Sequence, residues 1–85
     1  MSTNLNFKAI VTVKLRTAIL DVQGKTVENA LNSMGYGSIS HIRIGKHITL
    51  DVVAKNKEEA ENIVKKAADQ LLSNPIVEDY IVEIE

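Results

Sequence analysis

The sequence of 85 residues contains no cysteine and no tryptophan, and it has a single proline. Without cysteine the chain has neither a disulfide framework nor a thiolate metal site, a composition that fits a reducing compartment, so we expect the cytoplasm. Aromatic residues make up only 4% of the chain. The two tyrosines and one phenylalanine are too few and too scattered to form a stacking platform for nucleic-acid bases.

An excess of charge of either sign is also missing. Ten basic residues stand against eleven acidic residues, for a net charge of -1. Because no basic block is present, the chain lacks the electrostatic footprint of a nucleic-acid or membrane-surface binder. No apolar run approaches the roughly 20 residues that span a bilayer, and residues 1–6 are too polar for a signal peptide. We expect no nucleic-acid partner and no membrane partner.

The length of the chain predicts one domain, residues 1–85, in which residues 1–6 are expected to fray. A domain of this size buries only about 60% of the surface that its unfolded chain exposes. The core of a lone monomer would therefore be thin. We expect a dimer or a dimer of dimers, in which a second copy covers exposed strand edges.

Two alternating apolar runs joined at a glycine occupy residues 38–53, and they predict a β-hairpin. A regular two-residue turn at Gly45 and Lys46 would place the apolar residues of the two strands on opposite faces of the sheet. A three-residue connection through His47, or a tight turn followed by a one-residue bulge, restores a common apolar face. We therefore expect an irregularity within Gly45 to His47.

Two helices are predicted on either side of the hairpin. Asp21 caps the first, which carries apolar residues over positions 27–34 and closes at Gly35, a residue suited to left-handed backbone. Asn56 caps the second, which carries an apolar stripe to Leu71 and Leu72 and stops at an Asn-Pro pair. Each helix is amphipathic and is expected to cover one face of a sheet.

Alternating residues predict one strand over 7–15 and another over 77–85. The resulting order is β-α-β-β-α-β. It predicts an α+β fold of the ferredoxin-like type, a four-stranded antiparallel sheet with both helices on one face. The strand over 7–15 and the second strand of the hairpin would be central, and the other two strands would be edges.

Candidate catalytic and ligand-binding groups are few. His41, His47 and Asp51 have side chains that could hold a metal ion, although an exposed strand and turn also account for them. The stretch from Asp21 to Gly24 could expose helix amides to an anion, although an ordinary helix cap accounts for Asp21. We expect no catalytic, cofactor-binding or metal-binding residue in this chain.

The expected turn of the hairpin carries an unusual number of basic groups. Arg43, Lys46 and His47 fall within five positions of one another around Gly45, and a purely structural hairpin does not need three such groups. We therefore expect Arg43, Gly45, Lys46 and His47 to form a surface that meets a partner.

Short motifs occur in a recognisable order between Phe7 and Glu85. They are Leu20-Asp21-x-Gln23-Gly24, Ala30-Leu31, Gly35-Tyr36, Ile42-Arg43-Ile44-Gly45-Lys46 and Asn74-Pro75-Ile76-Val77-Glu78-Asp79-Tyr80. With this order and spacing the chain resembles the PurS family, the small subunits of phosphoribosylformylglycinamidine synthase. It departs from the family at Thr17-Ala18, where Pro-Gly is common, at Val22, where proline is common, and at His47, where tyrosine is common. The first two departures bear on the loop over residues 16–22.

The resemblance implies a subunit of a ligase of purine biosynthesis, which uses ATP and glutamine-derived ammonia to convert formylglycinamide ribonucleotide to its amidine. In that family a large subunit holds the ATP and nucleotide chemistry, and a glutaminase subunit releases the ammonia. The small subunit bridges these two partners and carries no catalytic residue. The resemblance therefore implies that ATP, Mg²⁺ and glutamine are used by the complex, while this chain binds no cofactor.

Two functions of other classes compete with this reading. A free-standing regulatory or small-ligand-binding module of ferredoxin-like type would bind a metabolite between paired domains, but the chain lacks a glycine-rich ligand loop. A small acyl-phosphate hydrolase would need a basic phosphate cradle, which is not visible in the sequence.

Overall fold

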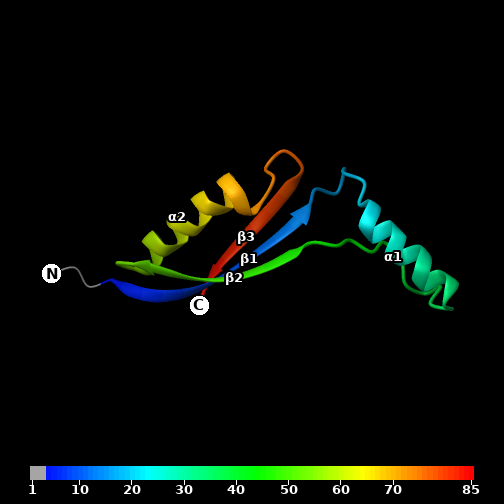
Figure 1. Ribbon diagram of the computed structural model, residues 1–85, viewed down its shortest axis with the longest axis horizontal. Helices are drawn as coiled ribbons and strands as arrows, with labels where there is room; N and C mark the ends of the chain where they lie inside the picture. The colour runs from blue at the N-terminus through cyan, green and yellow to red at the C-terminus, as the bar shows by residue number, and fades with distance from the viewer. Residues whose placement is uncertain (1–3) are drawn as a thin grey trace.

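The computed structural model describes residues 4–85, whose elements follow the order β-α-β-α-β (Figure 1). The strands form one antiparallel sheet in the order β2-β1-β3, with β1 (Leu5–Leu15), β2 (Lys46–Ala54) and β3 (Glu78–Ile84). The helices are α1 (Val22–Ser33), α2 (Lys57–Ala67) and η1 (Ala68–Leu72), a π-helical turn that continues α2. Of the residues expected to fray, Leu5 and Asn6 belong to β1, and residues 1–3 lie outside the described range.

The predicted four-stranded sheet is wrong, because the described chain forms three strands and no hairpin over residues 38–53. Only the second half of that stretch is a strand, β2, and it is an edge rather than a central strand. The broader ferredoxin-like α+β class still fits. The irregularity expected within Gly45 to His47 is also absent, because β2 begins at Lys46 and pairs with β1 without interruption from that residue onward.

The first half of the expected hairpin fails to become a strand because its backbone finds other partners. The amide nitrogens of Ile42 and Ile44 donate to the carboxylates of Glu28 and Asp21. His41 has a φ of 58°, in the left-handed region, which interrupts an extended run. A backbone amide that is already satisfied by a side chain has no free energy to gain from a strand ladder.

The core lies between the sheet and α2. Alternation along β1 directs one set of its side chains toward α2, as predicted, and the corresponding residues of β2 and of the helix close around them. The buried residues are small and aliphatic: Ala9, Val11, Val13, Val52, Ala54, Ala60, Val64 and Ala68. Half-buried residues of β2 and β3, among them Ile48, Leu50 and Val82, pack around this set.

Helix α2 begins as predicted and ends differently. Asn56 caps it by accepting from the Glu59 amide at 2.8 Å, and Lys65 pairs with Glu61 at 2.8 Å on its exposed side. At its end the amide of Ser73 donates to the Ala68 carbonyl, a wider π-type turn. This extra width turns Leu71 away from the core and leaves it 84% exposed, whereas Leu72 packs against the core as predicted.

Helix α1 makes no substantial contact with the described strands of the sheet, and it projects beyond their end with the segments that flank it (Figure 1). We call residues 16–45 the arm. The molecule measures 61 × 25 × 14 Å and has a radius of gyration of 17.1 Å, whereas a compact chain of this length would have about 12 Å. The prediction that both helices cover one face of the sheet is therefore wrong for α1.

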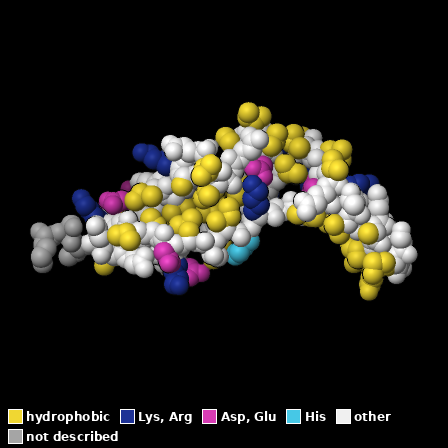
Figure 2. All heavy atoms as spheres, in the orientation of Figure 1, with side chains coloured by type: hydrophobic (Ala, Val, Ile, Leu, Met, Phe, Trp, Pro, Cys, Tyr) yellow, Lys and Arg dark blue, Asp and Glu magenta, His cyan; other side chains and the backbone are white. Residues whose placement is uncertain are grey.

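Most of the apolar residues of α1 and its C-cap consequently face outward. Val22 is 66% exposed and Met34 is 70% exposed, and Val27 is exposed as well. Figure 2 shows hydrophobic side chains gathered on the outer end of the arm. The helix itself forms as predicted, with Asp21 as its cap and Gly35 at φ 97° just beyond its end. Local sequence signals thus specify the helix, but the described chain leaves most of its apolar stripe exposed.

Candidate partner interface

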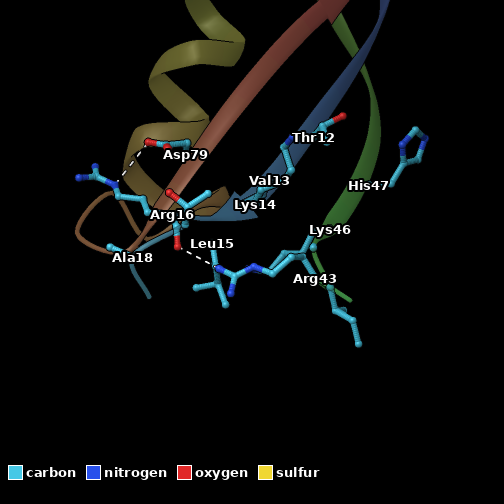
Figure 3. Close-up of a pocket in the computed structure, with 13 residues that line it drawn as sticks. Thr12, Val13, Lys14, Leu15, Arg16, Ala18, Arg43, Lys46, His47 and Asp79 are labelled. Carbon is cyan, nitrogen blue, oxygen red and sulfur yellow. Dashed lines mark hydrogen bonds and ion pairs between the residues drawn. The ribbon is translucent and has the colours of Figure 1, made fainter. Parts of the chain in front are cut away.

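A hollow of about 840 Å³ opens where the arm leaves the sheet (Figure 3). Its walls are residues 12–18 at the end of β1, residues 43–47 at the start of β2, and Asp79 of β3. The four residues predicted to form a partner surface, Arg43, Gly45, Lys46 and His47, all line it. The structure therefore brings these residues together around one concave surface, although they do not sit at a hairpin turn.

Arg43 is engaged with its own chain. Its Nη2 donates to the carbonyl oxygens of Arg16 and Ile19, each at 2.9 Å. Figure 3 shows this side chain reaching toward Arg16 across the hollow. The guanidinium therefore holds the loop between β1 and α1 in place, a role that the sequence did not suggest.

Two ion pairs join the rim of the hollow to β3. Arg16 Nε lies 3.4 Å from Asp79 Oδ1, and Arg16 Nη2 also donates to the Pro75 carbonyl at 2.6 Å. Lys46 Nζ lies 3.9 Å from Glu78 Oε2. The side chains of Arg16 and Lys46 are each about half exposed, and ion pairs of this kind contribute little in water. Lys46 therefore remains accessible to a partner.

Gly45 and His47 have different roles on the same strand. A Cβ at Gly45 would collide with the carbonyl oxygen of Val13, so glycine lets the start of β2 approach β1 closely. His47 lies opposite Thr12 in the register, exposed on the sheet face away from α2. Gly45 is thus a structural residue, whereas His47 is available at the surface.

The carboxylate of Asp21 is the most buried charged group of the described chain, with 4% of the residue exposed. Its Oδ1 accepts from the Gly24 amide at 2.8 Å, which is the predicted cap, and its Oδ2 accepts from the Ile44 amide at 2.6 Å. These two backbone donors, together with the nearby Arg43 guanidinium, hold the pKa of the Asp21 carboxyl below its usual value. The second contact fixes α1 to the strand-like segment before β2.

Glu28 makes a second such contact, which was not predicted from the sequence. Its Oε1 accepts from the Ile42 amide at 3.2 Å, its Oε2 lies 3.7 Å from Lys25 Nζ, and its side chain is 16% exposed. The Ile42 donor, and then Lys25, lower the pKa of the Glu28 carboxyl. The spacing between Asp21 and Glu28 could have indicated this contact, because residues about two helical turns apart lie on the same face of a helix.

The residues considered as metal ligands do not converge. His41 lies in the arm, where its Nδ1 is 3.1 Å from Ser40 Oγ, whereas His47 and Asp51 lie on β2. Across residues 4–85, no group of three or more histidine, aspartate or glutamate side chains is arranged to hold a metal ion. At the start of α1, the Asp21 carboxylate already accepts from the Gly24 amide that an anion would have used.

Among the helices that the structure describes, none is long and apolar enough to cross a membrane.

The sequence matches the family model "PurS: Phosphoribosylformylglycinamidine (FGAM) synthase" over residues 8–85. The phosphoribosylformylglycinamidine synthase subunit PurS of Thermotoga maritima is 43% identical over 76 residues, which cover 89% of this chain and 93% of that protein. The corresponding subunit of Bacillus subtilis is 38% identical over 79 residues, which cover 93% of each chain.

Solved structures agree with these matches. The crystal structure of the purS subunit of phosphoribosylformylglycinamidine synthase from Thermotoga maritima superposes with a TM-score of 0.88 at 40% identity, covering 98% of this chain and 95% of that one. A chain in the structure of PurLQS from Thermotoga maritima superposes with a TM-score of 0.87 at 41% identity, covering 95% and 99%. Because the superpositions span nearly the whole chain, they include the projecting arm.

Proposed function

The chain belongs to the PurS family, and on that basis we propose that it is the non-catalytic small subunit that bridges the large synthase subunit and the glutaminase subunit of a phosphoribosylformylglycinamidine synthase. This enzyme is a ligase of purine biosynthesis. In the proposal the bridge allows ammonia released from glutamine to reach the synthase. ATP, Mg²⁺ and glutamine are used by the partner subunits, this chain binds none of them, and the complex works in the cytoplasm.

One observation carries the proposal. A chain 41% identical to this one, and 99% covered by the superposition, is part of the PurLQS structure from Thermotoga maritima. The similarity extends over the sheet, α2 and the arm together, so it concerns the whole described fold rather than one motif.

We place the contact with a partner subunit at the hollow described above. Its lining holds four cationic side chains, Lys14, Arg16, Arg43 and Lys46, against the carboxylate of Asp79. This balance favours an acidic segment of a partner subunit, which would be attracted before contact and aligned on binding. Lys46 and His47 are the exposed contact groups, while Arg43 and Gly45 maintain the shape of the surface.

Self-association is the second partner contact that we propose. The sheet leaves half-buried apolar residues such as Ile48 and Leu50 on the face that α1 would cover in a ferredoxin-like fold. Helix α1 instead carries Val22, Val27 and Met34 into solvent. Two copies related by a twofold axis could each cover the other's sheet with this helix, which would bury both surfaces at once.

Reconstitution with purified partner subunits tests the bridging role. We expect no synthase, glutaminase or ATPase activity from this chain alone, and we expect glutamine-dependent synthesis by the partners to fail when it is omitted. Supplying ammonia directly separates loss of transfer from loss of the synthase itself. If glutamine-supplied and ammonia-supplied reactions both run at full rate without this chain, the bridging role is wrong and a free-standing module becomes the better reading.

A further inference from the structure

Hydrogen bonds from backbone amides to side-chain carboxylates join segment 42–44 to helix α1. Ile42 and Ile44 are two positions apart in an extended segment, so their amides point to the same side. Asp21 and Glu28 are about two turns apart on α1, so their carboxylates lie along one face of the helix. The Ile44 amide donates to Asp21 and the Ile42 amide donates to Glu28. The helix therefore supplies the acceptors that a neighbouring strand would normally provide.

Arg43, between these two residues, contacts the loop that precedes α1. Its guanidinium binds the carbonyl oxygens of Arg16 and Ile19, both at 2.9 Å. Segment 42–44 is thus fixed both to α1 and to the loop that leads into α1. Both ends of the arm are tied by the same three residues.

Gly24 is what allows the helix to come this close. It is the only buried residue of α1. A Cβ at this position would collide with the carbonyl oxygen of Ile42 and would lie 2.6 Å from Asp21 Oδ2. A larger residue would push α1 away from segment 42–44. The hydrogen bonds that the amides of this segment donate to Asp21 and Glu28 would then lengthen. The glycine and the two carboxylates therefore form one arrangement.

From these contacts we infer that Asp21, Glu28 and Arg43 are positioning residues that clamp the arm in one direction, so that α1 meets a second copy of this chain already ordered. The functional role of the clamp rests on the proposed self-association, whereas the contacts that form it are present in the single chain. Order in the free chain matters because association otherwise has to overcome the entropy of fixing a loose segment. The clamp supplies that order where the described arm has almost no hydrophobic core of its own.

Hydrogen exchange at the amides of Ile42 and Ile44 tests the clamp directly in the full-length chain. Asp21→Ser is the sharpest variant, because serine keeps a helix cap for Gly24 but has no second oxygen for Ile44. We expect exchange at Ile44 to rise by about tenfold or more, while helix content by circular dichroism and protection of Val11 in the sheet stay unchanged. Glu28→Ala should likewise raise the exchange rate of the Ile42 amide. Asp51→Asn and Glu58→Ala, at exposed carboxylates outside the arm, are the matched controls.

Self-association of the same variants separates the clamp from the proposed function. If the chain associates, Asp21→Ser and Glu28→Ala should weaken that association by about fivefold or more, and the controls should not. A wild-type chain that stays monomeric with slow exchange at Ile42 and Ile44 would contradict self-association and leave the clamp standing. Unchanged exchange at both amides in the two variants would overturn the clamp, whatever the oligomeric state.

Discussion

The carboxylate of Asp21 joins the first turn of α1 to the backbone of Ile44, with 2.6 Å between Oδ2 and the amide nitrogen and a separation of 23 in sequence. One side chain thereby caps α1 and also anchors the segment that leads into β2. Substitutions at the base of the arm should for this reason differ in effect from substitutions on its surface.

Reversing the charge of Lys46 should weaken binding to the partner subunits and leave the fold intact. Its side chain is exposed and its only described ion pair, with Glu78, is long, so the expected change in stability of Lys46→Glu is within about 0.5 kcal/mol. Co-elution of each purified partner subunit with the variant measures the loss. Lys66→Glu, on the exposed side of α2, is the control, and normal assembly of Lys46→Glu would show that the partner binds elsewhere.

Arg43→Glu should behave differently from Lys46→Glu, because the Arg43 guanidinium holds two carbonyl oxygens of its own chain. We expect the loop over residues 16–19 to loosen as well as partner binding to fall. Hydrogen exchange of the Ile19 amide, which donates to Arg16, reports the loosening. Equal exchange in the variant and the wild type would contradict the structural role of Arg43.

Val64→Ala should lower the free energy of unfolding by about 2 to 3 kcal/mol, because it removes two buried methyl groups and leaves a cavity. Val64 is 1% exposed and lies between α2 and the sheet. Leu71→Ala is the matched control, since Leu71 faces solvent and its truncation leaves no cavity. Urea unfolding followed by circular dichroism gives both values. A larger loss at Leu71 would mean that η1 packs differently from the structure.

Stability should fall in acid partly through Asp21 and Glu28. Both carboxyls have folded-state pKa values below their usual values of 3.8 and 4.5. A depressed pKa means that the folded state favours the ionised form, so the contribution is present above the usual value and is lost as pH falls through the folded one. Urea midpoints measured from neutral to acid pH should decline less steeply in Glu28→Gln than in the wild type. Parallel curves would contradict this assignment, and Glu58→Gln provides the control.

Val27→Glu should reduce self-association by placing a charge on the apolar face of α1. Light scattering should then give a mass near the 9.4 kDa of one chain at concentrations where the wild type is larger. Leu71→Glu adds the same charge to an exposed apolar position outside the arm and should leave the mass unchanged. A wild type that is itself monomeric at micromolar concentration would contradict the proposed dimer.

The sequence predicts the elements that depend on local signals. Alternation places β1 and β3, and the caps Asp21 and Asn56 place the starts of both helices. The strand predicted around Ile42 and Ile44 is absent. An alternating sequence looks the same whether its backbone amides donate to a neighbouring strand or to the carboxylates of a helix. The choice depends on Asp21 and Glu28, which lie 23 and 14 positions away from their partners. The predicted burial of Leu71 is wrong for a different reason. The apolar stripe was counted with the period of an α-helix, and the π-type turn changes that period.

The candidate surface was predicted in part. Arg43, Gly45, Lys46 and His47 do gather around one hollow, but no pattern in the sequence indicates that Arg43 and Gly45 stabilise the fold. Their partners, the carbonyl oxygens of Arg16, Ile19 and Val13, are backbone atoms that every residue carries. Side-chain identity alone cannot reveal contacts of this kind.

The position of β1 between both other strands has a consequence during synthesis on the ribosome. Ala9 of β1 pairs with Leu50 and also with Ile84, so the first strand to emerge waits for the last one before the sheet is complete. Until β2 and α2 have followed it, its apolar residues, such as Val11 and Val13, have no partner to cover them. Long-range pairing of this kind slows folding and exposes nascent chains to aggregation. We therefore expect the growing chain to depend on a holding chaperone more than a helical bundle of equal length would.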